Sequence, residues 1–380
     1  MAEALFYISL ILVAYVYAGY PLAAAALGLV RSRPVRKEPQ LPAVTVVIAA
    51  YNEEEAIGAT VANKLALDYP AELLDILVIS DGSTDHTDEI VAGCGSGRVR
   101  LLRQEPRAGK TSALNRAIPR ARGEIIVFSD ANSLYAPDAV RRLVANFADG
   151  TVGYVTGRMI YANPDGTPIG QGCSAYMRYE NALRAMETRI GSVVGVDGGI
   201  DAVRTTLYRP MAADQLPDFV LPLAVVSQGY RVVYEPEALL WESALKEARD
   251  EYRMRVRVSL RSLWGLYDMR HLLVPWRRSL FAWQLWSHKV LRYLCFVFLA
   301  VAYLANLLLW GKGHGYQAFF VLQNVAYLSA LAMPLLESGG AGCRALTFAR
   351  YFVLLNVAAA HAFGKFLRGE KQVIWTPRKG

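Results

Sequence analysis

Apolar runs long enough to cross a membrane stand at both ends of the chain, and a more polar pattern fills its middle. The first run extends from Ala4 to Val30. As a helix rising about 1.5 Å per residue, it would exceed the roughly 30 Å hydrocarbon core of a bilayer. Three more runs occupy the last quarter of the chain, at Tyr293–Trp310, Tyr316–Leu336 and Leu346–Phe363. The pattern therefore predicts four membrane helices.

The N-terminal run is predicted to be a retained anchor rather than a cleaved signal peptide. Glu3, and no Lys or Arg, precedes it, and it is too long for a signal peptide. Basic residues follow at once and place the next segment in the cytoplasm by the positive-inside bias: Arg31, Arg33, Arg36 and Lys37. Four crossings would return the C-terminus to the outside, whereas a basic tail favours the inside, and the sequence leaves both alternatives open.

Residues 276–292 mix large aromatic and cationic side chains. Trp283 and Trp286 are followed by His288, Lys289 and Arg292. This mixture predicts an interfacial amphipathic helix with its aromatic side in the headgroup layer. A helix packed on the soluble domain is the alternative.

Residues 42–275 alternate short β-branched runs with helical patterns. Strands are expected at 43–50, 74–80, 98–102 and 124–129, and helices at 54–67, 87–92, 110–121 and 137–147. This alternation predicts an α/β domain with a mostly parallel sheet sandwiched by helices. The expected order is thus an anchor and basic linker (1–41), a cytoplasmic domain (42–275), the interfacial helix (276–292), and about three membrane helices with a basic tail (293–380).

Composition supports this hybrid of a soluble domain and membrane helices. The 380 residues are 54% hydrophobic and 19% charged, which excludes a disordered chain, and the mean hydropathy is +0.22. The net charge of +8 comes from basic residues clustered beside apolar runs, so we expect no nucleic-acid partner. The four cysteines form no C-x-x-C pair, and neither a zinc site nor a disulfide framework is expected.

Polar residues follow three of the expected strands: Tyr51-Asn52-Glu53, Asp81 to Asp85, and Asp130-Ala131-Asn132. Because parallel strands end at one edge of a sheet, these residues are expected to line one site for a polar ligand or a metal. No G-x-G-x-x-G follows the first strand, and Gly109-Lys110-Thr111 lacks the upstream glycine of a phosphate loop. A Rossmann dinucleotide site and a Walker A site are therefore excluded.

The ordered set of motifs resembles that of the family 2 glycosyltransferases. It runs Tyr51-Asn52-Glu53, Asp81-Gly82-Ser83, Gly109-Lys110 with Ala113-Leu114-Asn115, and Asp130-Ala131-Asn132. Those enzymes are inverting and use nucleotide-sugar donors. The likeness covers about Val44 to Arg261, and the flanking apolar runs are similar to the membrane branch, which includes the cellulose, hyaluronan, chitin and poly-N-acetylglucosamine synthases. It implies a GT-A-like sheet with transmembrane helices at both ends.

The resemblance also implies roles for individual residues. Tyr51, Glu53 and Asp81 match positions that hold the uridine, and Lys110 falls near the diphosphate. Asp130 matches the first acid of the D-x-D element, which binds Mg²⁺ or Mn²⁺ on the donor diphosphate. The second acid is replaced by Asn132, which would ligate the metal without charge; a helix N-cap is the alternative role for Asn132.

The catalytic base and the acceptor region depart further from the family pattern. Asp218 is the one acid left where the family places its base, and it would take the proton of the acceptor hydroxyl. Its alternative role is to cap a helix beginning at Phe219. Of the family's Q-x-x-R-W element only Arg257 stands in register, as a further donor-binding residue. Val258 replaces the tryptophan, for which Trp264 is a distant substitute.

These implications lead to a multi-pass protein of the cell (inner) membrane that transfers a sugar from a nucleotide sugar, with UDP as the expected nucleotide. The acceptor is expected to be a glycan or lipid-linked molecule, in cell-surface polysaccharide or glycolipid synthesis. Four helices are few for an export channel, so an oligomer or export partner is expected if a polymer leaves the cell. Because Asn132 and the broken Q-x-x-R-W depart from the family, the alternative is a weak or dead transferase-fold subunit that acts as a scaffold for glycan export.

Overall fold

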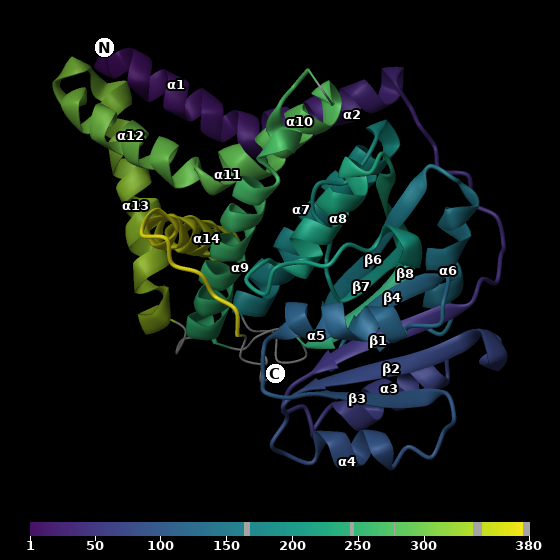
Figure 1. Cartoon of the computed structure of the whole chain (residues 1–380). Helices are drawn as coiled ribbons and strands as arrows, with labels where there is room; N and C mark the ends of the chain where they lie inside the picture. Colours follow the sequence, from purple (N-terminus) through teal and green to yellow (C-terminus); the bar gives the residue numbers. More distant parts are fainter. Residues whose placement is uncertain (163–167, 244–246, 277, 337–343, 375–380) are drawn as a thin grey trace.

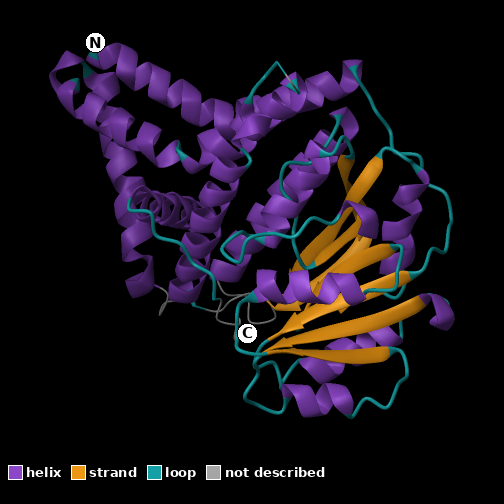
Figure 2. Ribbon diagram, in the orientation of Figure 1, coloured by secondary structure: helices purple, strands orange, loops and turns teal. Residues whose placement is uncertain are grey.

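A computed structural model of the chain describes residues 1–162, 168–243, 247–276, 278–336 and 344–374. In it, a mixed sheet flanked by helices lies beside a group of long apolar helices (Figures 1 and 2). The expected α/β class and the expected flanking helices are both present. Cys94, Cys173 and Cys295 are free thiols, and Cys343 lies outside the described residues.

Eight strands form one sheet in the order β3-β2-β1-β4-β7-β6-β8-β5. The half that was expected from the sequence, β3-β2-β1-β4, is parallel throughout. Beyond it β7 runs antiparallel to both β4 and β6, whereas β6 and β8 are parallel to each other. The sheet is therefore mixed but mostly parallel, because only β7 and β5 run against the other strands. The strands are β1 (Val44–Ala50), β2 (Leu74–Asp81), β3 (Val99–Gln104), β4 (Ile125–Asp130), β5 (Leu134–Tyr135), β6 (Val152–Ala162), β7 (Ile200–Arg204) and β8 (Arg231–Ser243).

Helices cover both faces of the sheet, which is why every residue of β1 is buried. Alternate side chains of β1 enter two separate apolar cores, with Val46 and Ile48 in one and Val47 in the other. The first core lies under α3 (Ile57–Leu65), α4 (Thr87–Ala92) and α6 (Ala139–Ala145). The second lies under α5 (Lys110–Ala117), α8 (Pro217–Ser227) and α10 (Ser279–Leu285).

Two long helices, α7 (Pro168–Ile190) and α9 (Ala248–Asp268), stand between the sheet and the apolar helices in Figure 1. The apolar helices are α1 (Ala2–Ala14), a π-helical turn (Tyr15–Gly19) and α2 (Tyr20–Val30), then α11 (Leu291–Tyr293), α12 (Cys295–Leu308), α13 (His314–Leu336) and α14 (Arg344–Leu367). The three C-terminal apolar runs are therefore helical, close to their expected bounds.

One helix in the described part of the chain, Ala2–Val30, is long and apolar enough to cross a membrane, and 17% of its most apolar stretch is buried. A second candidate exists if Ser279–Tyr293 and Cys295–Leu308, which meet at a bend of 56°, count as one span. These one or two helices indicate membrane association. Crossing by α13 and α14 stays a prediction.

Residues 279–293 pack on the α/β domain as well as beside the N-terminal helix. His288, in the π-helical turn Trp286–Val290, is 1% exposed and contacts the carboxylates of Glu187 at 2.7 Å and Glu180 at 3.3 Å. Tyr20 donates a hydrogen bond to the same Glu187, at 2.5 Å. The buried side of this segment therefore packs on the α/β domain, as in the alternative to an interfacial helix. Its placement in a headgroup layer stays a prediction.

Candidate active site

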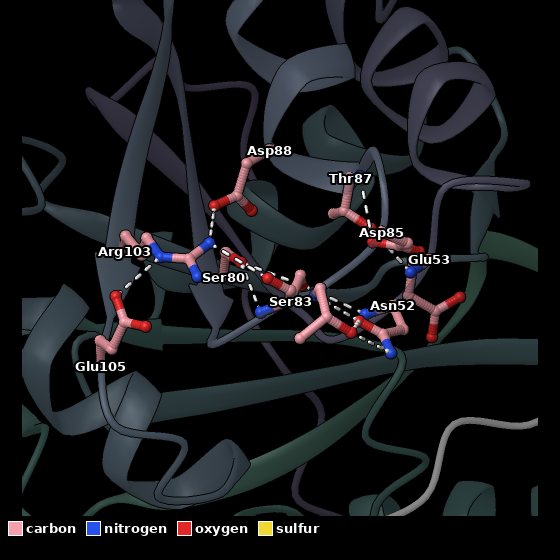
Figure 3. Close-up of polar contacts among 10 residues, drawn as sticks. Asn52, Glu53, Ser80, Ser83, Asp85, Thr87, Asp88, Arg103 and Glu105 are labelled. Carbon is pink, nitrogen blue, oxygen red and sulfur yellow. Dashed lines mark hydrogen bonds and ion pairs between the residues drawn. The ribbon is translucent and has the colours of Figure 1, made fainter.

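The loops that follow β1 and β2 are joined by a network of short polar side chains (Figure 3). Asn52 adopts a left-handed φ of 52°, and its Oδ1 accepts the backbone N–H of Thr84 at 2.8 Å. The N–H of Asn52 donates to Ser83 Oγ, and the N–H of Glu53 donates to Thr87 Oγ1 at 2.8 Å. Asparagine tolerates left-handed backbone better than most residues, which suits it to this turn. The network fixes Tyr51 and Glu53 beside the end of β2.

Asp81, the last residue of β2, is fully buried, and both of its carboxylate oxygens accept hydrogen bonds from other residues of the chain. It accepts hydrogen bonds from Gln104 Nε2 at 2.6 Å and from the backbone N–H groups of Ala108 and Gly109 at 2.8 and 2.9 Å. Such charge-assisted bonds hold the loop that leads into α5. Asp81 therefore fixes the backbone of the loop before α5, beside the predicted site.

Arg107, which the sequence did not single out, lies over the ring of Tyr51. Its guanidinium carbon is 3.3 Å from the ring centroid, and its Nε is 3.7 Å from the Asp81 carboxylate. An arginine in this arrangement combines cation–π attraction with ion pairing. The signal for it in the sequence was only a basic residue three positions before Lys110, in a loop of unknown path.

Lys110 joins two of the predicted carboxylates. Its ammonium is 2.6 Å from Asp130 Oδ1, at the end of β4, and 4.0 Å from Asp218 Oδ1, in the first turn of α8. Burial alone would lower the pKa of Lys110, but Asp130 and Asp218 outweigh burial and raise it above its usual range. Lys110 is therefore a permanent positive charge between two acids that are 88 positions apart in the sequence.

Glu53 faces a local excess of negative charge. Burial, and then the nearby Asp130, Asp85 and Glu242, raise the pKa of Glu53 to about 7. No three acidic, histidine or cysteine side chains among the described residues are grouped closely enough to hold a metal ion by themselves. The acidic environment of Asp130 nevertheless suits a divalent cation that takes its remaining oxygen ligands from a bound phosphate compound.

Asn132 lies half-buried in the turn after β4, two residues beyond Asp130. The following helix, α6, begins only at Ala139 and has Asp138 at its N-cap position. The capping alternative for Asn132 is therefore wrong, and its carbonyl oxygen stays a predicted metal ligand.

Asp218 stands in the first turn of α8 rather than at its cap. The helix begins at Pro217, with Leu216 at the N-cap position, so the capping alternative for Asp218 is wrong as well. The positive end of the helix dipole stabilises a carboxylate there. Gly198 contacts this carboxylate directly, because a Cβ atom on Gly198 would lie 2.4 Å from Asp218 Cγ.

Residues 195–199 form the loop that adjoins Asp218, and the buried carboxylate of Asp201 holds this loop in place. Asp201, 1% exposed, accepts hydrogen bonds from Tyr154 Oη at 2.8 Å and from the Gly198 N–H at 3.0 Å. Burial raises the pKa of Asp201 to about 7. Arg184 pairs with Asp197 at 2.6 Å and fixes the other end of the loop.

The contacts near Asp218 involve Arg261 of α9, which the sequence did not single out. Arg261 donates to Thr111 Oγ1 at 3.0 Å and to the carbonyl of Gln215, three residues before Asp218. Arg257, one turn earlier on α9, is half-buried, and its donor-binding role stays a prediction. Arg255 is ion-paired with Glu251 at 2.8 Å.

The C-terminal tail lies over the same site. The Val373 carbonyl packs so closely on Gly109 that a Cβ there would approach it to 2.8 Å, and Lys371 pairs with Asp214 at 2.5 Å. Trp264 donates its indole N–H to the Glu370 carbonyl at 2.8 Å. Trp264 thus anchors the tail, which Figure 1 shows running from α14 toward α5.

A cavity of about 220 Å³ opens behind Asp218, between the catalytic domain and the apolar helices. Its lining includes Asp218, Arg184, Lys289 and Arg292, together with apolar side chains of α14. Glu180 is buried in the lining and pairs with Arg292. The partners of Glu180 lie more than 100 positions downstream, so no local pattern in the sequence indicates this pairing.

Fold and site together define an α/β domain of the GT-A type, with polar and charged side chains gathered at the carboxyl ends of its strands. Residues 45–199 match the family model "Glycosyl transferase family 2". This segment, which is less than half of the chain, is a domain of glycosyltransferase family 2.

Curated relatives and solved structures are similar to the chain. A beta-monoglucosyldiacylglycerol synthase from Nostoc sp. is 34% identical over 187 residues, which are 47% of this chain and 40% of the relative. A poly-beta-1,6-N-acetyl-D-glucosamine synthase from Staphylococcus aureus is 29% identical over 230 residues, 57% of this chain and 54% of the relative. The chain thus spans about half the length of the curated relatives it matches.

One such solved structure is a mannosyltransferase from Pyrobaculum calidifontis in complex with GDP-Man and Mn²⁺. It is 24% identical, with a TM-score of 0.73 over 97% of this chain and 100% of that one. At this identity the likeness shows the fold, and it includes the helices outside the catalytic domain.

Proposed function

We propose that the chain is a membrane-bound inverting glycosyltransferase that moves a sugar from a nucleotide sugar to a hydroxyl of a glycan or lipid-linked acceptor. The observation that carries this proposal is Lys110 between Asp130 and Asp218, with a cavity opening behind Asp218. A donor diphosphate on the Asp130 side and an acceptor in the cavity would meet at this point.

The residues divide the reaction between them. Asp218 removes the proton from the acceptor hydroxyl as its oxygen attacks the anomeric carbon. The bond from that carbon to the diphosphate oxygen breaks on the opposite face, and its electron pair leaves with the nucleoside diphosphate, so the anomeric configuration inverts. Lys110 offsets the charge that develops on the departing diphosphate.

Mg²⁺ or Mn²⁺, held by Asp130 and Asn132, would neutralise the same leaving group when bound. Mn²⁺ accompanies the donor in the Pyrobaculum mannosyltransferase, which supports this choice. Arg107 over Tyr51, together with Glu53, would border the nucleoside half of the donor. UDP is the nucleotide that the motifs favour, and GDP is the second candidate because the Pyrobaculum protein holds GDP-Man.

We further propose the domain order and setting expected from the sequence. Residues 1–41 anchor the chain, 42–275 form a cytoplasmic catalytic domain, 276–292 lie at the membrane interface, and 293–380 return to the membrane as a multi-pass segment of the cell membrane. The exposed apolar side chains of the first helix support this setting, including Ile11, Leu22 and Leu29.

A nucleotide-release screen on the full chain in detergent tests the proposal. UDP-glucose, UDP-N-acetylglucosamine and GDP-mannose would each be assayed with Mn²⁺, with Mg²⁺ and with a chelator, in the presence of membrane lipid extract. We expect metal-dependent release from one donor and a product heavier than its acceptor by one sugar residue. Absence of release from every donor, with donor binding retained, would instead support the scaffold alternative.

A further inference from the structure

The cavity behind Asp218 contains one cation that differs from the others. Arg184 is paired with Asp197, and Arg292 with Glu180. Lys289 also lines the cavity, where it is half-buried. Glu180 and Glu187 attract its ammonium, but both carboxylates are bound to His288, and none of the ion pairs among the described residues includes Lys289. A charge held away from water is costly unless it has a partner of opposite sign.

The position of Lys289 is built into the fold. It sits in the π-helical turn Trp286–Val290, next to His288, which is buried between two glutamates. Its ammonium lies directly over Gly195, where a Cβ would approach it to 2.3 Å. The same loop carries Gly198 against the Asp218 carboxylate, and three residues of chain span no more than about 11 Å. A single head group can therefore reach both Lys289 and Asp218.

The rest of the cavity indicates that the head group belongs to an amphiphile. Beside Lys289 the wall is formed by Tyr17 of the N-terminal helix and by Leu355 and Ala359 of α14. These side chains belong to the apolar helices, whose outer surfaces are rich in exposed leucine and valine. These side chains offer an apolar tail a surface to pack against beside the polar part of the cavity.

On these grounds we propose that the acceptor is a lipid whose head group carries a phosphate, bound by Lys289, beside the hydroxyl that Asp218 deprotonates. The inference rests on the proposed function and names its acceptor class. An ammonium donates charge-assisted hydrogen bonds to phosphate oxygens. A neutral lipid such as diacylglycerol has no anionic oxygen and cannot accept such bonds. Phosphodiester lipids and polyprenyl-phosphate-linked sugars share this chemistry.

Acceptor kinetics with matched lipids test the proposal. The full chain in detergent would be assayed with dioctanoylglycerol, dioctanoyl phosphatidylglycerol, and a short polyprenyl-diphosphate-linked sugar, using the donor found in the release screen. We expect a phosphate-bearing lipid to be preferred at least tenfold in kcat/KM, and its identity distinguishes the two lipid sources. Equal or better use of dioctanoylglycerol would overturn the proposal.

Substitutions assign the preference to one residue. Lys289→Gln should raise the KM for the phosphate-bearing acceptor about tenfold or more, the loss expected for a charge-assisted bond, with a smaller effect on kcat. Lys289→Arg should restore most of the affinity. Lys312→Gln makes the same charge change on an exposed turn between α12 and α13 and should leave KM unaltered. An equal KM for Lys289→Gln and the unmodified chain would contradict the assignment.

A binding measurement separates failure of this inference from failure of the proposed function. Dioctanoyl phosphatidylglycerol and the polyprenyl-diphosphate sugar should each be tested for raising the melting temperature of the donor-free protein, relative to dioctanoylglycerol. A rise with a phosphate lipid that Lys289→Gln removes would support the acceptor site even in a chain without transferase activity. No difference between the phosphate lipids and dioctanoylglycerol would count against it, whatever the enzyme assay gives.

Discussion

Substitution of Gly198 by alanine tests whether the position of the Asp218 carboxylate governs catalysis. Gly198 has a φ of +84°, and a Cβ there would lie 2.4 Å from Asp218 Cγ and 2.5 Å from its Oδ2. Apolar contacts have their optimum near 3.5–4.0 Å. The methyl group therefore has to push the carboxylate aside by about 1 Å. Left-handed backbone costs an alanine a further ~1–2 kcal/mol of folding free energy.

The two costs have different consequences. The backbone term lowers stability, whereas displacement of a catalytic group by about 1 Å is expected to reduce kcat roughly 100-fold. Gly229 separates them, because it has a similar φ of +98° but no atom within 4 Å of its Cβ position. It lies at the opposite end of α8 from Asp218. Gly229→Ala should therefore lose a similar amount of stability without the loss of kcat.

Thermal unfolding and nucleotide release would be measured on both variants with the donor identified by the screen. We expect melting temperatures lowered to a comparable extent in both, and a kcat lowered about 100-fold in Gly198→Ala alone. The reasoning is refuted if Gly198→Ala retains kcat within a few fold of the unmodified chain. It is equally refuted if the Gly229 variant loses as much activity, because strain alone would then explain the effect.

Three further predictions follow from the same geometry. Asp218→Asn should lower kcat by ~10²–10⁴ while calorimetry still detects donor binding. Asp250 is an exposed acid on α9, and Asp250→Asn should leave kcat unchanged. Full turnover in Asp218→Asn would remove Asp218 from its role. Because the folded-state pKa of Glu53 is raised to about 7, its contribution to stability should fall as pH rises from about 4.5 to 7. Glu53→Gln should flatten that part of the melting profile, and an unchanged slope would contradict the pKa shift. Lys371→Glu sets like charges against Asp214 and should speed hydrogen exchange in residues 369–374, while unchanged exchange would mean that this pair does not hold the tail.

The catalytic half of the fold could be predicted from the sequence because its signals are local. Strand β1 is a continuous β-branched and apolar run, and α5 begins at Lys110 after a glycine with φ of +93°. The expected bounds of these elements were correct to within a few residues. The pairing of strands in the second half of the sheet was not predicted, because the antiparallel pairing of β7 with β4 and β6 joins segments 40–80 positions apart.

The candidate site divides in the same way. Glu53, Asp81 and Asp130 follow strands directly, so order along the chain was sufficient to place them at one edge of the sheet. Arg107 and Arg261 were missed because their importance comes from what they reach: the Tyr51 ring and the loop before Asp218. No periodicity of hydrophobic residues encodes such contacts, since each depends on how a loop or helix is oriented in the folded chain.

The tail that lies on Gly109 constrains how the polypeptide can be threaded through a bilayer. Asp268, at the end of α9, and Lys371, after α14, both contact the catalytic domain, through Gln215 and Asp214 respectively. If the segment between them crosses a bilayer, both of its ends lie on the same side, so the number of full crossings in it is even. Three full C-terminal crossings would be an odd number and would place the basic tail on the side of the membrane opposite to the α/β domain. An even count agrees with the basic tail, which by the positive-inside bias favours the same side as the basic residues after the first apolar run.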